Sequence, residues 1–149
     1  MAELTIREAR LDDAAAVAAL LGELGYPNSA EFAREKLREL EASEPDTVLV
    51  AEAAGGVAAV GHLHEATLFH APGKVGRVMA LAVAEGYRRR GAASELLTRL
   101  EEVAREAGCT KMEITSGLHR PGAHEFYEGM GYVEKPKRFV KDLRGGPDG

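Results

Sequence analysis

Three consecutive arginines, Arg88, Arg89 and Arg90, stand directly before Gly91 and the start of a predicted helix. A helix N-terminus presents unpaired N–H groups and a partial positive charge, so acidic residues are the usual choice there. Arginines at that place are unfavourable unless an anion joins them, and small residues let backbone amides approach a ligand closely. The segment therefore predicts a site for a phosphate or pyrophosphate. The alternative is a solvated turn whose arginines pair with surface acids.

The two common nucleotide-binding motifs are absent from the sequence. No G-x-x-x-x-G-K-[ST] occurs, and no G-x-G-x-x-G follows a predicted strand. A phosphate-rich ligand other than a P-loop nucleotide or a Rossmann dinucleotide is therefore favoured. Nucleic acid is not expected as a partner, because 19 basic against 24 acidic residues give a net charge of −5 and no aromatic stacking platform is seen.

A second group of residues could accept a proton. His62 and His64 stand two apart on a predicted strand, so their side chains share a face. Imidazole titrates near neutrality and could deprotonate an amine directly or through water. His70, His119 and Glu65 are weaker candidates, and the alternative for each histidine is a hydrogen-bonded surface residue.

No metal site and no nucleophilic cysteine are predicted. No third ligand accompanies the histidine pair at a recognisable spacing, and Cys109 is the single cysteine, so neither a disulfide within the chain nor a cysteine-based metal site can form. Cys109 follows a helix-stopping glycine, and nothing around it indicates an electropositive setting or a histidine partner.

The elements that must position these residues alternate between strands and helices. The expected strands are Leu4–Arg10, Thr47–Ala54, Val57–Glu65, Val78–Val83, Lys111–Thr115 and Tyr132–Val140. The expected helices run from Asp12 and Asp13 to Leu24, from a capping box at Asn28 and Glu31 to Leu40, over Gly91–Ala107 and over His119–Gly129. Gly55 and Gly56 predict a tight hairpin between the second and third strands.

Length and composition indicate one domain over residues 1–144 and a loose tail over 145–149. The chain has 149 residues, of which 45% are hydrophobic and 29% charged, as is ordinary for a soluble globular protein. No run approaches the length of a membrane-spanning helix, and the N-terminal segment does not resemble a secretory signal. A cytoplasmic location and no membrane partner are therefore expected.

Two segments resemble motifs of the GNAT N-acetyltransferase superfamily. Arg88–Ala93 is similar to R/Q-x-x-G-x-G/A, whose amides in that family bind the pyrophosphate of acetyl-CoA. Leu81–Val83 stands where the family's splayed fourth strand offers backbone groups to the pantetheine arm and the thioester. Ala123–Tyr132 resembles A-x-x-F-Y-x-x-x-G-F/Y. The resemblance covers roughly the whole chain in the order of its elements.

The resemblance implies a mixed α/β (α+β) fold with a mostly antiparallel central sheet. About six or seven strands would be flanked by about four helices, with a splay between the fourth and fifth strands. The residues that the resemblance places against acetyl-CoA are Leu81, Ala82, Val83, Arg88, Arg89, Arg90, Gly91, Ala92, Ala93, Ser94, Arg120 and Phe126.

The resemblance also implies direct acetyl transfer from acetyl-CoA to a primary amine. A backbone N–H near Val83 would meet the developing oxyanion, and Tyr127 stands where the family places the acid that protonates the leaving thiolate. The alternative for Tyr127 is a core tyrosine. Arg120 replaces an asparagine found in many members, and Met79 stands where some members carry a glutamate base. His62 and His64 are therefore the candidate bases.

The sequence alone does not identify the substrate. A small-molecule amine is favoured over a protein lysine or N-terminus, and a homodimer is possible, since family members often pair. A different class of function, a CoA-binding sensor or interaction domain with little catalysis, fits the missing glutamate and the change at Arg120. Thiol release in the presence of an amine discriminates these two classes.

Overall fold

The computed structural model describes residues 3–115, 122–135 and 139–144. The chain forms two compact units, Met1–Thr115 and Ser116–Gly149. Among the described residues, the first unit holds five strands and three α-helices, and the second holds one α-helix.

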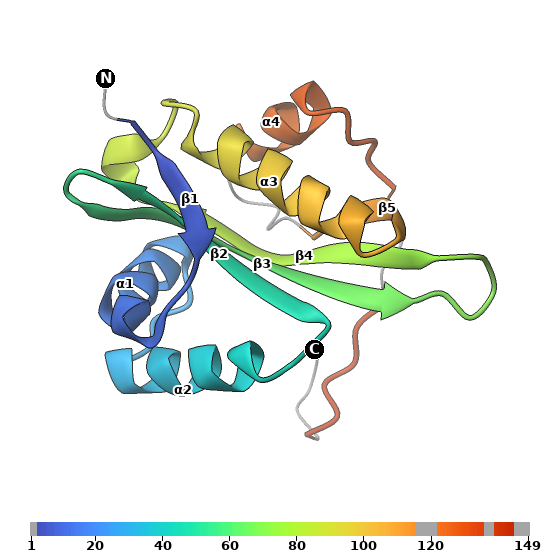
Figure 1. The fold of residues 1–149 in the computed structure, drawn as a ribbon, viewed down its shortest axis with the longest axis horizontal. Coiled ribbons are helices and arrows are strands. Elements are labelled where there is room, and N and C mark those ends of the chain that lie inside the picture. The colour runs from blue at the N-terminus through green and yellow to red at the C-terminus, as the bar shows by residue number, and fades with distance from the viewer. Residues whose placement is uncertain (1–2, 116–121, 136–138, 145–149) are drawn as a thin grey trace. The chain divides into compact units, whose positions relative to one another are not determined.

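The first unit is built on a five-stranded sheet in the order β1-β2-β3-β4-β5 (Figure 1). The strands are β1 (Thr5–Glu8), β2 (Asp46–Ala53), β3 (Gly56–Thr67), β4 (Lys74–Val83) and β5 (Cys109–Ile114). Short connections join β2 to β3 and β3 to β4, so these neighbours are antiparallel. β5 pairs with β4 in parallel, because a helix crosses between them.

Helices cover both faces of this sheet (Figure 1). A short 3-10 turn, η1 (Leu11–Asp13), leads into α1 (Ala14–Leu24), and α2 (Ala30–Glu41) packs beside α1 on one face. On the other face lies α3 (Ala92–Glu106), which follows a second 3-10 turn, η2 (Glu85–Tyr87). The buried side of α3 consists of Ala92, Leu96, Leu97, Leu100 and Ala104, the helical spacing that the sequence predicts.

Strand β3 and helix α3 pack closely against each other at Gly61. A Cβ added at Gly61 in β3 would lie 2.9 Å from Cδ1 of Leu100 and 3.4 Å from Cδ1 of Leu81. A side chain at this position would force the leucine side chains to shift, and Leu81 of β4 is part of the same contact. The middle of α3 therefore packs closely on β3 at Gly61.

A β-bulge interrupts β4 at Met79. The register passes from His62 opposite Ala80 to Leu63 opposite Val78, which leaves Met79 as the extra residue. Met79 is 57% exposed, so β4 is not buried on both faces at this position. β5 pairs with β4 only as far as Val78, which lies opposite Ile114, the last residue of β5.

The start of α2 differs from the sequence prediction by one residue. Ser29, rather than Asn28, is the N-cap, and its Oγ accepts a hydrogen bond from the backbone N of Phe32 at 3.0 Å. The side chain of Asn28 instead donates from Nδ2 to the carbonyl oxygen of Tyr26 at 2.8 Å. The serine hydroxyl satisfies one of the free N–H groups of the first helical turn, and the asparagine closes the preceding turn.

The second unit contains α4 (Ala123–Gly129). The expected strand at Tyr132–Val140 is wrong for residues 132–135 and 139–140, and the sheet therefore has five strands rather than six or seven. Gly131 adopts a left-handed φ of +96°, and the N–H of Tyr132 donates to the carbonyl oxygen of Tyr127 at 3.0 Å. This cap ends α4 and occupies a donor that a strand would need. Residues 136–138, the predicted tail at 145–149 and the predicted helical residues before Gly122 lie outside the described residues.

An ion pair between Arg7 and Asp13 connects β1 to the 3-10 turn before α1. Nη1 and Nη2 of Arg7 each lie 2.9 Å from the carboxylate of Asp13, which also accepts the backbone N–H of Arg10 at 2.7 Å. Asp13 is buried, and the hydrogen bond from Arg7, with support from Arg10, outweighs the effect of burial and lowers the pKa of the Asp13 carboxyl.

We expect Asp13→Ala to lower the free energy of unfolding by about 2–3 kcal/mol, because the guanidinium of Arg7 loses its two-point partner and keeps only Glu52, 3.2 Å from its Nε. The lowered pKa means that this stabilisation is present above the unfolded carboxyl's pKa and is lost as pH falls through the lower folded value. Urea unfolding at several pH values measures both effects. Asp12→Ala is the control, since Asp12 is exposed, and a loss of similar size there would contradict the assignment.

Candidate active site

The loop between β4 and α3 has an unusual backbone. Arg88 is extended, with φ −68° and ψ 144°, Arg89 has a φ of +65°, and Gly91 has a φ of +83°. Glycine adopts positive φ freely, but for an arginine this conformation is uncommon and costly. Such strain tends to persist at functional sites, where the surrounding structure holds it. The loop turns sharply and brings three exposed arginines to the start of α3.

Free backbone donors gather at the same point. The first helical bond of α3 runs from the N–H of Glu95 to the carbonyl oxygen of Gly91 at 3.0 Å. The N–H groups of Ala92, Ala93 and Ser94 therefore have no acceptor within the helix, and no side chain caps it. The hydroxyl of Ser94 donates to the carbonyl oxygen of Gly91 at 3.1 Å. The positive end of a 15-residue helix is thus left open beside the arginines.

The three arginines differ in their contacts. The Nε of Arg88 donates to the carbonyl oxygen of Val83 at 3.2 Å, and its Nη2 lies 3.6 Å from the carboxylate of Glu23 in α1. Glu23 also accepts the backbone N–H of Glu85 at 3.2 Å. No ion pair of Arg89 or Arg90 is found within the described part of the chain. The alternative prediction, arginines paired with surface acids, thus describes Arg88 and not its two neighbours.

The backbone of Leu81–Val83 has one open edge. On one side these residues pair with Gly61, Val60 and Ala59 of β3. On the other side β5 has already ended at Ile114, opposite Val78, so in residues 3–115 no strand occupies that edge. This segment leads directly into the arginine loop, and Arg88 of that loop donates to its Val83 carbonyl oxygen.

The two candidate bases meet at one carboxylate. The Nε2 of His62 lies 2.7 Å and the Nδ1 of His64 lies 3.0 Å from Oδ1 of Asp46, the first residue of β2. The prediction that the histidines share a face is thereby confirmed. Burial opposes ionisation of Asp46, but hydrogen bonds from Ser43 and the two histidines outweigh it and lower the pKa of the carboxyl. Sequence analysis did not identify Asp46.

The weaker candidates are scattered. His70 is exposed in the connection between β3 and β4, Glu65 lies 3.5 Å from Nζ of Lys74, and His119 is outside the described residues. Burial raises the pKa of the Cys109 thiol, which disfavours the reactive thiolate. Within the described ranges, no group of three histidine, cysteine or acidic side chains could hold a metal ion.

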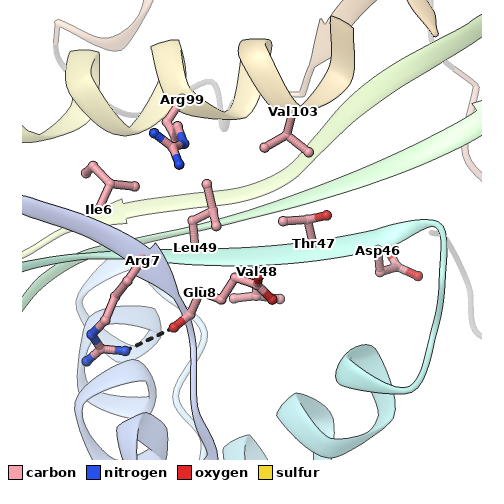
Figure 2. Close-up of a pocket in the computed structure, with 9 residues that line it drawn as sticks. All are labelled: Ile6, Arg7, Glu8, Asp46, Thr47, Val48, Leu49, Arg99 and Val103. Atoms are coloured by element: carbon pink, nitrogen blue, oxygen red, sulfur yellow. Dashed lines mark hydrogen bonds between the residues drawn. The ribbon is translucent and has the colours of Figure 1, made fainter. Parts of the chain in front are cut away.

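Two hollows mark the first unit. A cavity of about 110 Å³ lies among α1, α2 and the sheet, lined mainly by apolar side chains together with Asn28, Lys36, His62 and Ala80. A second hollow, of about 320 Å³, lies along β2 where β1 has ended, with Arg99 and Val103 of α3 on one side (Figure 2). None of the described residues predicted to bind acetyl-CoA lines either hollow, and the smaller one is lined by the candidate base His62.

The second unit places the aromatic residues of the second motif together. The rings of Phe126 and Tyr127 are 5.2 Å apart between centroids, and those of Tyr127 and Tyr132 are 6.2 Å apart, both edge-on. Phe126 and Tyr127 are half-buried. The acid role of Tyr127 and the cofactor contact of Phe126 stay predictions, and Arg120 lies outside the described residues.

Sequence comparison identifies the family. Residues 15–132 match the profile of the Acetyltransferase (GNAT) family. The match covers most of the chain, and the order of strands and helices agrees with it. The chain belongs to the GNAT acetyltransferase family.

Particular relatives are also similar. The aminoalkylphosphonate N-acetyltransferase of Salmonella typhimurium is 34% identical over 89 residues, 60% of this chain and 58% of that enzyme. The glucosamine 6-phosphate N-acetyltransferase 1 of Oryza sativa subsp. japonica is 38% identical over 113 residues, 73% of this chain and 67% of that enzyme. The chain thus spans less than two thirds of the Salmonella enzyme.

The fold is shared with solved acetyltransferase structures. The aminoglycoside N-acetyltransferase AAC(6')-Iy, solved in complex with CoA, superposes with a TM-score of 0.83 at 15% identity and covers 97% of each chain. This likeness confirms the predicted mixed α/β fold. No helix in the described residues is long and apolar enough to cross a membrane.

Proposed function

We propose that this protein transfers an acetyl group from acetyl-CoA directly to the primary amine of a small molecule. The observation that carries the proposal is the strained loop at Arg89 in a chain that belongs to the GNAT family. Within the described residues, this loop presents Arg89 and Arg90 without an ion pair and helix amides without a capping side chain, and it follows the edge of β4 on which no described strand lies. A pyrophosphate fits the donors of this loop, since backbone N–H groups and guanidinium groups both bind phosphate oxygens.

Acetyl-CoA supplies the acetyl group as a thioester, and the chain supplies the binding and proton-transfer groups. A backbone N–H near Val83 stabilises negative charge that develops on the carbonyl oxygen as the amine attacks. One of His62 and His64 accepts the proton that the amine loses, and Tyr127 donates a proton to the leaving sulfur. Each proton thus has a named acceptor or donor.

The substrate class rests on the named relatives. The Salmonella and rice enzymes are named for an aminoalkylphosphonate and for glucosamine 6-phosphate, both small amines. The second candidate function, a CoA-binding module with little catalysis, is favoured by Met79, which stands at the bulge where some family members carry a glutamate. A cytoplasmic location and a homodimer stay predictions from the sequence.

Thiol release from acetyl-CoA across a panel of amines tests this function. The panel spans aminoalkylphosphonates, amino-sugar phosphates, polyamines, aminoglycosides, and lysine and N-terminal peptides. We expect saturable release of one thiol per acetylated amine with a small-molecule member. Release with peptides alone would assign a protein substrate, and tight acetyl-CoA binding without release would support the binding module.

A further inference from the structure

We infer that Asp46 is a positioning residue that holds His62 and His64 in the tautomers in which they can act as bases. The inference rests on the proposed acetyl transfer and names a part of the machinery that neither the motifs nor the relatives indicate. The carboxylate itself does not touch the amine. Its effect passes through the two imidazole rings.

Asp46 is fixed before it meets the histidines. Its Oδ2 accepts the hydroxyl of Ser43 at 2.6 Å, and its backbone N–H donates to the carbonyl oxygen of Ser43 at 3.0 Å. The side chain is only 9% exposed. The turn between α2 and β2 therefore sets the carboxylate position, and Oδ1 is left to face β3.

The hydrogen bonds determine where each ring carries its proton. A carboxylate only accepts hydrogen bonds, so both rings must donate an N–H to Oδ1. Neutral His62 then carries its proton on Nε2 and keeps the lone pair of Nδ1, whereas neutral His64 carries its proton on Nδ1 and keeps the lone pair of Nε2. A partner at one nitrogen fixes the other as the base.

His62 is placed where a base could act. This residue lines the cavity among α1, α2 and the sheet. In the register of β3 and β4 it lies directly opposite Ala80, which precedes the open edge at Leu81. His64 is 37% exposed against 20% for His62, so the pair runs from the cavity toward solvent. A proton accepted on Nδ1 of His62 yields an imidazolium whose Nε2–H still faces the carboxylate.

Asn28, which also lines this cavity, carries an unsatisfied acceptor. Its Oδ1 is buried and has no hydrogen-bond partner among the described residues, while Nδ2 of that amide donates to the carbonyl oxygen of Tyr26 at 2.8 Å. The bond from Nδ2 orients the amide, so the unsatisfied atom is the acceptor. A buried acceptor without a donor is unfavourable, and an amine N–H would satisfy it.

The other charged groups near the rings are already engaged. Lys36 of α2 lines the cavity and lies 3.7 Å from Glu39, and Arg77 of β4, opposite His64 in the register, lies 3.0 Å from Glu113. Next to His64 on β3, Glu65 pairs with Lys74. Within the described chain, Asp46 is the charged group in direct contact with the two rings.

Asp46→Asn tests the inference in the full chain, with an amine that the panel identifies. We expect kcat/KM at pH 7 to fall about 10- to 100-fold. The affinity for acetyl-CoA should not change. Glu44→Gln, which removes an exposed carboxylate two residues away, is the control.

Nitrogen-15 NMR of the imidazole rings gives a readout that needs no activity. In the unaltered protein we expect a neutral His62 protonated on Nε2 and a neutral His64 protonated on Nδ1, with both preferences weakened in Asp46→Asn. The opposite tautomers, or a kcat/KM unmoved by Asp46→Asn, would overturn the inference. Absence of acetylation with the expected tautomers would instead count against the proposed function, so the two failures are distinguishable. If Asp46→Asn does not fold, the tautomers of the unaltered protein still decide.

Discussion

Tyr127→Phe is expected to lower kcat by about 100- to 10,000-fold, the range over which a positioned acid contributes to a reaction. A free thiol has a pKa of about 8.5, so expulsion of a thiolate is slow unless a proton reaches the sulfur. Phenylalanine keeps the ring that contacts Phe126 and Tyr132 and removes only the hydroxyl. Acetyl-CoA affinity should therefore stay nearly constant, because a leaving-group acid acts mainly in the transition state.

Single-turnover kinetics and calorimetric titration measure the two quantities separately. Tyr132→Phe is the matched control, since it removes a hydroxyl from the neighbouring ring of the same cluster. We expect it to leave kcat within about threefold, a change of less than 1 kcal/mol. An unchanged kcat in Tyr127→Phe would assign the residue to packing alone, which is the alternative that the sequence left open.

Patterns confined to one element were predictable from the sequence. The stripe of apolar residues on α3 has the helical period, and the helix lies within one residue of its predicted bounds. The arginine loop was predictable for the same reason, because its charges stand directly beside the predicted helix start in the sequence. Both are properties of neighbouring residues, so no knowledge of distant contacts was needed.

Register was not predictable, and it decides which residues meet at the site. Ala53 pairs with Gly56 at the hairpin. If that register continued unbroken along β2 and β3, Asp46 would lie opposite Leu63. A bulge shifts the register by one residue, and Asp46 lies opposite His64 instead. A shift of one residue exchanges the two faces of a strand, so a carboxylate partner for the histidines could not be found from spacing alone.

The same reasoning explains the error at the end of the chain. Alternation of residue types predicted a strand from Tyr132, but the N–H of Tyr132 closes the cap of α4 and Gly131 turns the chain. A helix cap formed across five residues competed with the strand pattern and prevailed. The bulge at Met79 was also not predictable, because nothing in the pattern of residue types along β4 marks the extra residue.

Arg88→Ala combined with Arg90→Ala is expected to raise the dissociation constant of acetyl-CoA about 100-fold or more. Hydrogen bonds to charged groups contribute about 1.5–3 kcal/mol each, and both arginines stand at the open start of α3. Arg88 also donates to the carbonyl oxygen of Val83, so its loss loosens the loop as well. Arg90→Ala alone separates the two effects, since Arg90 makes no ion pair within the described residues.

Isothermal titration with acetyl-CoA and with dephosphorylated pantetheine fragments measures where the loss arises. If the arginines bind the pyrophosphate, the variants lose affinity for acetyl-CoA but not for fragments that lack it. The affinity of the unaltered protein for acetyl-CoA should also fall as salt rises, because exposed charges are screened. Arg105→Ala, which removes an exposed arginine from the last turn of α3, should leave both affinities unchanged. Equal binding of acetyl-CoA by the double variant and the unaltered protein would refute the pyrophosphate assignment and leave the strain at Arg89 without a ligand to explain it.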